Sequence, residues 1–306
     1  MVTVENLTKS YSEGKVKAIT NLTFRVNEGE VFGMIGPDGA GKTTLFRILT
    51  TLLLPDSGNA QVAGFDIQKQ YKNIRESVGY MPGKFSLYQD LTVEENLSFF
   101  ATVFGTTIEQ NYALIKDIYS QIEPFRKRKA GQLSGGMKQK LALSCALIHR
   151  PKVLFLDEPT TGVDAVSRKE FWEMLRRLKS QGITILVSTP YMDEASLCDR
   201  IALIQNGSIL SINTPQAVTS AFGEKLFGIK SEMMYTLQQD LRSSSVVKSC
   251  NAFGEFYHLT LKDTSDDASS ALLRSLKEKG HQSLEFEEIT PKIEDCFIKL
   301  MSEGSN

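Results

Sequence analysis

The sequence predicts an α/β fold with a mixed, mostly parallel sheet, followed by a small α+β domain. Continuous apolar strands such as residues 153–156 alternate with helical stretches such as residues 165–180, which is typical of a parallel sheet covered on both faces. A glycine-rich turn joins a buried strand at residues 30–35 to a helix that begins at Lys42. Beyond residue 220 the order strand, helix, strand, strand, helix, strand predicts a separate domain.

The first domain is expected to cover residues 1–220. Residues 2–6 and 16–26 alternate apolar and polar side chains, which predicts two half-buried strands. Between about residues 85 and 145 the strand signals are weak and apolar residues recur with helical spacing, which predicts a helical subdomain. A further buried strand is expected at residues 183–188, directly after the helix at 165–180.

The second domain is expected to cover residues 221–306. Its pattern predicts strands near 225–230, 246–252, 255–262 and 281–288, and helices near 232–242, 267–279 and 292–301. This order of elements is that of a ferredoxin-like fold.

Composition and charge exclude several classes of protein. The 306 residues are 41% apolar and carry a net charge of −1, so no overall basic field favours nucleic acid as a partner. The basic run at residues 126–129 is interpreted as a solvated loop. No apolar run approaches the roughly 20 residues of a membrane-spanning helix, and the first residues lack a signal-peptide pattern. We therefore expect a cytoplasmic protein whose membrane role, if any, depends on docking to another chain.

Cysteine and histidine residues give no indication of a zinc site or a nucleophile–histidine pair. The four cysteines are scattered and form no C-x-x-C pair, as in proteins of a reducing compartment. His149, His258 and His281 have no second plausible metal ligand near them in the sequence.

A phosphate-binding loop is the most specific motif. The eight residues that begin at Gly36 match G-x-x-x-x-G-K-[ST]; they are Gly36, Pro37, Asp38, Gly39, Ala40, Gly41, Lys42 and Thr43, and Thr44 follows them in the helix. Successive backbone N–H groups of such a loop face phosphates, and the helix N-terminus adds a positive partial charge. Lys42 is expected to reach the β- and γ-phosphates of ATP, and the Thr43 hydroxyl to ligate Mg²⁺.

A buried strand that ends in two carboxylates complements this loop. Residues 153–156 are apolar and are followed by Asp157 and Glu158. Asp157 is expected to hold the Mg²⁺ shell, directly or through water, and Glu158 to orient or deprotonate the attacking water.

A third motif identifies the family that this sequence resembles. Leu133, Ser134, Gly135, Gly136 and Gln139 match L-S-G-G-x-x-Q directly before a helix. Together with the other two motifs, this pattern resembles the ATP-binding cassette (ABC) family, whose cassette is a P-loop NTPase with antiparallel β and helical subdomains. The resemblance implies that this segment binds the γ-phosphate of ATP held by an opposite cassette, and hence a head-to-tail dimer.

Other family elements can be placed on the sequence. Tyr11 matches the aromatic residue that stacks on adenine, and Asp164 lies in the D-loop that crosses the dimer interface. Residues 85–93 match the region that touches the membrane permease. The resemblance covers residues 1 to about 220. The tail resembles the C-terminal extension of ABC-2-type exporter ATPases, and residues 292–298 are similar to its ending.

Two residues that the family uses in hydrolysis are absent. Gly83 stands where a glutamine should sense Mg²⁺ and water, and Pro190 stands where a histidine should contact the γ-phosphate. Glycine has no side chain for this role, and proline offers neither a side-chain donor nor an N–H group. Substitutes are available in principle, namely Lys84 or Gln89 for the glutamine and Thr189 or Tyr191 for the histidine.

The resemblance predicts the ATPase subunit of an ABC transporter, with ATP and Mg²⁺ as cofactors. Its partners would be a separate permease and a second cassette in a homodimer or heterodimer, and it would be peripheral on the cytoplasmic face of the membrane. The alternative, motivated by Gly83 and Pro190, is a hydrolysis-impaired ATP-binding switch or the degenerate half of a heterodimer. Translation-factor cassettes occur twice per chain, whereas this length holds one cassette. Chromosome-associated cassettes carry long coiled coils, whereas no heptad run appears here, so both classes are disfavoured. The sequence does not name a transported substrate.

Overall fold

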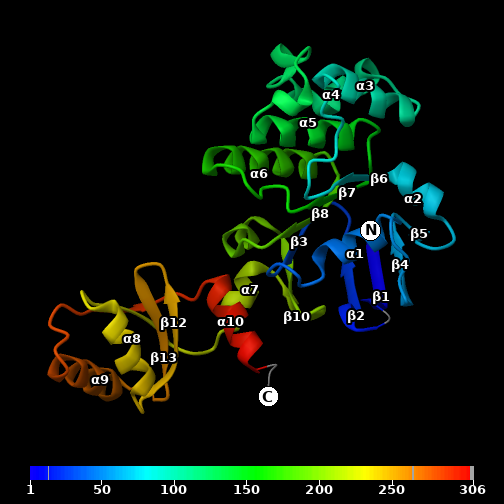
Figure 1. Cartoon of the computed structure of the whole chain (residues 1–306). Coiled ribbons are helices and arrows are strands. Elements are labelled where there is room, and N and C mark those ends of the chain that lie inside the picture. The colour runs from blue at the N-terminus through cyan, green and yellow to red at the C-terminus, as the bar shows by residue number, and fades with distance from the viewer. Residues whose placement is uncertain (13, 264, 304–306) are drawn as a thin grey trace. The chain divides into compact units, whose positions relative to one another are not determined.

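The computed structural model describes residues 1–12, 14–263 and 265–303, which divide into two units (Figure 1). The first unit runs from Met1 to Pro215 and the second from Gln216 onward. The division lies close to the expected boundary at residue 220. The short helix α7 (Pro215–Ser220) begins at the division and ends at that residue.

A six-stranded sheet forms the centre of the first unit, in the order β10-β9-β3-β8-β7-β6. All neighbouring strands are parallel except β10, which is antiparallel to β9. The strands are β3 (Val31–Ile35), β6 (Val78–Met81), β7 (Val153–Asp157), β8 (Thr184–Thr189), β9 (Arg200–Gln205) and β10 (Ser208–Asn213). Every residue of β3, β7 and β8 is buried, which explains why these strands are mainly apolar, with polar residues only at the ends of β7 and β8.

An antiparallel sheet in the order β2-β1-β4-β5 packs beside this core. Its strands are β1 (Val2–Tyr11), β2 (Val16–Val26), β4 (Ser57–Val62) and β5 (Phe65–Asp66). Helix α1 (Lys42–Leu49) lies between the two sheets and shares one apolar core with them. Within that core the ring of Phe46 from α1 meets the edge of Phe155 from β7.

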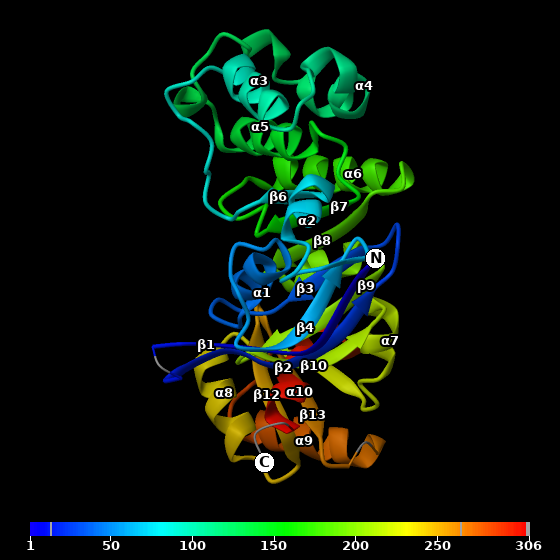
Figure 2. The same cartoon turned by 90° about the vertical axis from the view of Figure 1, so that its right-hand side faces the viewer.

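The remaining helices of the first unit are α2 (Tyr71–Ser77), α3 (Val93–Val103), α4 (Ile108–Tyr119), α5 (Gly135–Leu147) and α6 (Ala165–Ser180). Figures 1 and 2 show α3, α4 and α5 together in a helical layer beyond α6 and the central sheet. Capping boxes begin α3 at Thr92 and Glu95, and α4 at Thr107 and Gln110. Short 3₁₀ turns are η1 (Glu123–Phe125), η2 (Ala130–Gln132) and η3 (Met192–Leu197).

The second unit has a four-stranded antiparallel sheet in the order β12-β13-β11-β14. Its elements are β11 (Leu226–Lys230), α8 (Met234–Ser243), β12 (Val247–Phe253), β13 (Phe256–Leu261), α9 (Asp266–Glu278), β14 (Glu285–Ile289) and α10 (Ile293–Glu303). Leucines of α8 and α9 pack with alternate residues of β11 and β13 in one apolar core. The connectivity is β-α-β-β-α-β, the order of a ferredoxin-like fold.

The α/β fold with mixed sheets, a helical region and a smaller α+β unit confirms the predicted fold class. Several elements were not predicted, namely β4, β5, β6, β9, β10, α2 and α7. Strand β1 also continues to Tyr11, past the predicted end at residue 6. Strand β14 begins at Glu285 rather than at residue 281, because His281 is buried and bonded to Ser231 and Asp240 before the strand starts.

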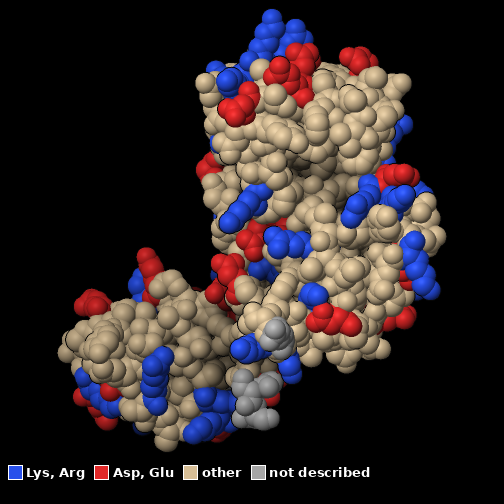
Figure 3. Space-filling view, turned by 45° about the vertical axis from the view of Figure 1, so that its right-hand side comes forward, with Lys and Arg blue, Asp and Glu red and all other residues tan. Residues whose placement is uncertain are grey.

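Charge on the surface is mixed. The face drawn in Figure 3 carries Lys and Arg side chains interspersed with Asp and Glu, in keeping with the net charge of −1. Among the described residues, no helix combines the length and the apolar character that crossing a membrane requires.

Candidate functional site

Two glycines give the loop between β3 and α1 its shape. Gly41 has a left-handed backbone with φ of 103°, and a Cβ atom there would lie 2.3 Å from the Ala18 carbonyl oxygen. A Cβ on Gly36 would lie 2.2 Å from the Ile204 carbonyl oxygen. Both positions therefore require glycine, because a backbone oxygen cannot yield as a flexible side chain would.

Lys42 lies under the loop that these glycines form. Its side chain is 2% exposed, and its Nζ donates to the carbonyl oxygens of Gly36 at 2.8 Å and Pro37 at 3.0 Å. The same Nζ lies 3.3 Å from Glu158 Oε1. Lys42 and Glu158, which are distant in the sequence, therefore meet beneath the loop.

The other residues predicted to bind ATP surround this point. Asp38 and Gly39 are exposed at the tip of the loop, whereas Ala40 is buried. Thr43 and Thr44 occupy the first turn of α1, which begins at Lys42. The Tyr11 hydroxyl at the end of β1 lies 3.3 Å from Thr44 Oγ1, so this 37%-exposed ring stands beside the loop.

Ser188, a residue that the sequence analysis missed, binds the Asp157 carboxylate and the backbone of Glu158. Asp157 is 2% exposed, and its Oδ1 accepts a 2.6 Å hydrogen bond from Ser188 Oγ. The Glu158 N–H donates to the Ser188 carbonyl oxygen at 3.0 Å. Parallel neighbouring strands end at the same edge of a sheet, and a hydroxyl at the end of the 183–188 strand was the available signal.

The two positions that lack the family's usual residues border the same site. A Cβ on Gly83 would lie 3.0 Å from the Asp157 carbonyl oxygen and 3.7 Å from Glu158 Cβ. Pro190 directly follows Thr189, whose carbonyl oxygen accepts from the Gly36 N–H at 3.3 Å. The departures from the family pattern therefore lie beside the carboxylates and the loop that are predicted to bind MgATP.

Thr189 and Tyr191 are already engaged with other residues. The buried Thr189 hydroxyl donates to Glu194 Oε2 at 2.6 Å and accepts from the Tyr191 N–H at 3.1 Å. The Tyr191 ring carries the Arg168 guanidinium 4.3 Å above its centre. The Thr189 hydroxyl and the Tyr191 ring are therefore already in contact with other residues of the chain.

The L-S-G-G-x-x-Q segment begins α5. Ser134 caps the helix and accepts from the Met137 N–H, while Ser134 and Gly135 are exposed and Leu133 is buried. A Cβ on Gly136 would lie 3.0 Å from Ser167 Oγ of α6. A helix N-terminus that is exposed at Ser134 and Gly135 is of the kind that binds anions in proteins.

One hydrogen bond joins this segment to the loop that follows Glu158, and a cap ends that loop at α6. The Gln139 side chain donates to the Pro159 carbonyl oxygen. Asp164 caps α6 by accepting from the N–H groups of Val166 and Ser167 at 3.1 and 3.0 Å. These hydrogen bonds, that of Ser167 first, hold the pKa of Asp164 below its usual value.

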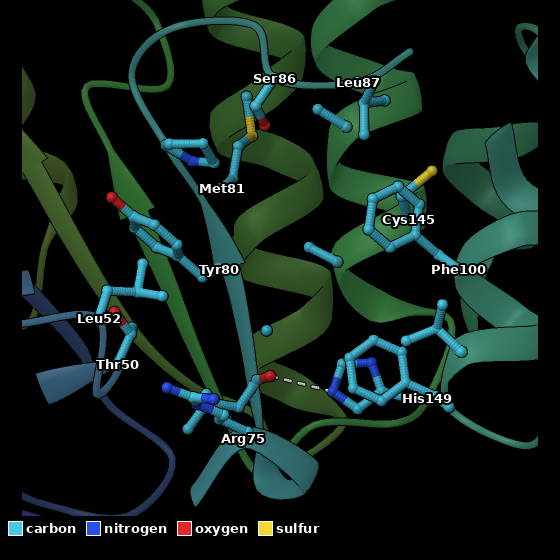
Figure 4. A pocket seen from close by; sticks show the side chains of 17 residues that line it. Thr50, Leu52, Arg75, Tyr80, Met81, Ser86, Leu87, Phe100, Cys145 and His149 are labelled. Carbon is cyan, nitrogen blue, oxygen red and sulfur yellow. Dashed lines mark hydrogen bonds between the residues drawn. The ribbon is translucent and has the colours of Figure 1, made fainter. Parts of the chain in front are cut away.

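A groove of about 600 Å³ opens between β6 and the helices α3 and α5 (Figure 4). Phe100 and Cys145 lie on its helical side, and Leu52 and Tyr80 on the side of the sheet. Ser86, from the segment predicted to touch the permease, lies at the rim. The lining is mainly apolar; it comprises Thr50, Leu52, Arg75, Val78, Gly79, Tyr80, Met81, Pro82, Ser86, Leu87, Phe100, Val103, Phe104, Ala142, Cys145, Ala146 and His149.

His149 forms one end of the groove. Its ring stacks on Phe104 with centres 3.8 Å apart, and its Nε2 lies 3.0 Å from the Val78 carbonyl oxygen, shown as the dashed line in Figure 4. Burial lowers the pKa of His149 below 6.5, so the ring is neutral at pH 7. Burial and, secondarily, Asp157 raise the pKa of Tyr80 to about 12, so its hydroxyl keeps its proton.

Comparisons with known proteins identify this set of features. Residues 19–161 match the model of the family described as ABC transporter. The Nod factor export ATP-binding protein I of Burkholderia lata is 36% identical over 299 residues, which cover 96% of this chain and 95% of that protein. The chain belongs to the ABC transporter ATP-binding proteins. This confirms the resemblance on which the site residues were predicted.

Other ABC proteins differ in length and share the fold. The probable multidrug ABC transporter ATP-binding protein YbhF of Escherichia coli (strain K12) is 41% identical over 308 residues, but this chain spans only 52% of its length. A solved ATP-binding subunit of an ABC transporter matches with a TM-score of 0.66 at 26% identity, covering 73% of this chain and 93% of that one. A dimeric cassette, MJ0796 bound to ADP and Pi, matches with a TM-score of 0.63 at 26% identity, covering 70% and 98%.

Proposed function

We propose that this chain is the ATPase subunit of an ABC-2-type exporter. The observation that carries the proposal is the convergence of Lys42 and Glu158, 3.3 Å apart, beneath a loop in which Gly36 and Gly41 admit no side chain. The exposed N-terminus of α5 at Ser134 supplies the second half of an ATP site to another cassette. ATP is the ligand that this combination fits in an ABC protein.

The phosphates of ATP would be bound by the loop, by Lys42 and by a metal ion. The loop's N–H groups and the α1 N-terminus would hold the β-phosphate, and Lys42 would reach the β- and γ-phosphates. Mg²⁺ fits the oxygen ligands present, because Thr43 offers a hydroxyl and Asp157 a carboxylate whose Oδ1 is oriented by Ser188. Once bound, the metal neutralises charge that develops on the phosphates.

Hydrolysis would depend on Glu158 as the residue that orients or deprotonates water. Gly83 and Pro190 remove two groups that normally assist, and one preorganised donor typically contributes about 10²–10³ in rate. We therefore expect slow turnover that Glu158 still makes measurable. ATP binding should be unaffected, because the loop, Lys42 and Tyr11 are all in place.

The active form would be a head-to-tail dimer of cassettes. Each Ser134–Gly136 segment would face the γ-phosphate of the opposite cassette, and Asp164 would lie at the interface. The dimeric state of MJ0796 with ADP and Pi supports this arrangement.

The apolar groove would receive the membrane permease. Its rim includes Ser86 and Leu87, from the region that the family uses for this contact, and exposes Leu52 and Val103. Export as the direction of transport is supported by relatives named for Nod factor export and doxorubicin resistance. The chain would then be peripheral on the cytoplasmic face of the membrane.

Steady-state ATP hydrolysis of the purified chain tests this function, with Glu158→Gln as the control. We expect wild-type turnover at least about tenfold above the control and abolished by chelation of Mg²⁺, with ATP bound by both proteins. A wild-type rate equal to that of Glu158→Gln would refute the ATPase.

A further inference from the structure

A buried carboxylate fixes the end of β8. Glu194 in η3 is 1% exposed, and its Oε2 accepts the 2.6 Å hydrogen bond from Thr189 Oγ1. Its other oxygen, Oε1, makes no hydrogen bond with any residue that the structure describes. A buried charge of this kind is costly unless an opposite charge accompanies it.

The opposite charge comes from Arg168 on α6. Arg168 Nε lies 3.7 Å from Glu194 Oε1 and is itself buried without a hydrogen bond to the described part of the chain. The guanidinium is held in place by the Tyr191 ring at 4.3 Å and by Asp193 Oδ2 at 3.5 Å. A buried carboxylate and a guanidinium that is 26% exposed thus face each other through two buried atoms, at a distance that a small shift would close to a hydrogen bond.

Both ends of this pair lead to the ATP site. On the Glu194 side, the carbonyl oxygen of Thr189 accepts a hydrogen bond from the Gly36 N–H of the phosphate-binding loop. The carbonyl oxygen of the preceding Ser188 accepts from the Glu158 N–H. On the Arg168 side, the backbone N–H of Arg168 donates at 2.9 Å to the carbonyl oxygen of the residue that caps α6. That cap is Asp164, in the loop expected at the dimer interface.

We propose that Arg168 and Glu194 are positioning residues for ATP hydrolysis. Their ion pair fixes the end of β8 and thereby the distance between Glu158 and the phosphate loop, in a cassette where Pro190 cannot contact the γ-phosphate. Because Arg168 lies one helical turn from Asp164, the pair also connects the end of β8 to the loop that is expected to contact the opposite cassette. The inference rests on the hydrolysis proposed above and assigns it two residues that touch neither nucleotide nor metal.

A double-mutant cycle with Glu194→Gln and Arg168→Met tests the pair. Glutamine keeps the size and an oxygen for Thr189 but loses the charge, and methionine keeps the stem without the guanidinium. The full chain is assayed for kcat and KM, for the Kd of MgATP, and for unfolding by urea. Lys169→Met is the matched control, because it removes a neighbouring exposed cation from the same helix turn.

Each single substitution is expected to lower kcat about tenfold while the Kd of MgATP stays within about twofold, since small misplacements of reacting groups are costly. The double variant should lose no more than the singles, because both remove one interaction. Lys169→Met should keep the wild-type kcat. If Arg168→Met fails to fold, Arg168→Lys takes its place in the cycle, with a smaller loss expected because the charge remains.

Three results would overturn the proposal: an unchanged kcat in both singles, losses that multiply in the double variant, or a Kd that weakens in step with kcat. The first two would show that the pair does not act as a unit, and the third would assign it to nucleotide binding. Failure of the proposed function is distinguishable, because then the wild-type chain itself turns over no faster than Glu158→Gln.

Discussion

Replacing Gly41 by alanine should destabilise the first unit by about 3 kcal/mol, the sum of two costs. A residue with a Cβ pays about 1–2 kcal/mol for a left-handed backbone such as φ of 103°. The new Cβ would lie 2.3 Å from the Ala18 carbonyl oxygen and 2.9 Å from Ile19 Cγ2, and such overpacking costs about 1–3 kcal/mol. The steric cost is large here because Ala18 belongs to β2 and cannot retreat alone.

Gly39→Ala is the matched control. Its φ of 78° imposes the backbone cost, but a Cβ there meets no heavy atom within 4 Å, so we expect a loss of only about 1 kcal/mol. Urea unfolding followed by the fluorescence of Trp172 measures both variants, because this single tryptophan is buried in α6 of the first unit. Equal losses for the two variants would refute the steric argument.

Three further outcomes are expected. Ser134→Ala should cost about 1 kcal/mol in urea unfolding, because α5 loses its N-cap acceptor. The free energy of unfolding should fall as pH drops below about 6.5, since the folded chain resists protonation of His149, and His149→Gln should flatten this slope. Leu52→Glu or Val103→Glu should abolish co-purification with the permease while kcat stays within about twofold, because both side chains are exposed at the groove; retained co-purification would contradict the assigned docking site.

The strands that carry motifs could be predicted because their signals are local. The apolar run of β7 and the two carboxylates after it are contiguous, as are the loop glycines before α1. Strand β4 was missed because its sequence, Ser57–Val62, contains glycine and asparagine and has little intrinsic preference for a strand. It becomes one by pairing with β1, with Val62 opposite Val2, a contact that no local pattern reveals.

The same distinction divides the candidate site. Lys42, Asp157 and Glu158 were predicted as members of motifs, but their meeting depends on how the parallel strands stand side by side. Ser188 and Arg168 were missed because each acts across elements, Ser188 on the neighbouring strand and Arg168 from α6 onto η3. Sequence patterns therefore predicted the groups expected to meet ATP, and not the residues that hold them in place.

Restoring the missing glutamine should raise turnover. At Gly83 the Cβ direction leads toward the Asp157 carbonyl oxygen at 3.0 Å and Glu158 Cβ at 3.7 Å, so a longer side chain there would project toward the carboxylates after a shift of a few tenths of an ångström. Because one preorganised donor contributes about 10²–10³ in rate, we expect Gly83→Gln to raise kcat at least tenfold.

Gly83→Ala separates chemistry from backbone effects, since it adds the Cβ without the carboxamide and should leave kcat near the wild-type value. The Kd of MgATP should change little in either variant, because Lys42 and the loop remain as they are. If Gly83→Gln is no faster than Gly83→Ala, the absent glutamine does not limit the reaction. The slow step would then have to be sought at Pro190, where the contact with the γ-phosphate is also missing and where the hydroxyl of Thr189 is already committed to Glu194.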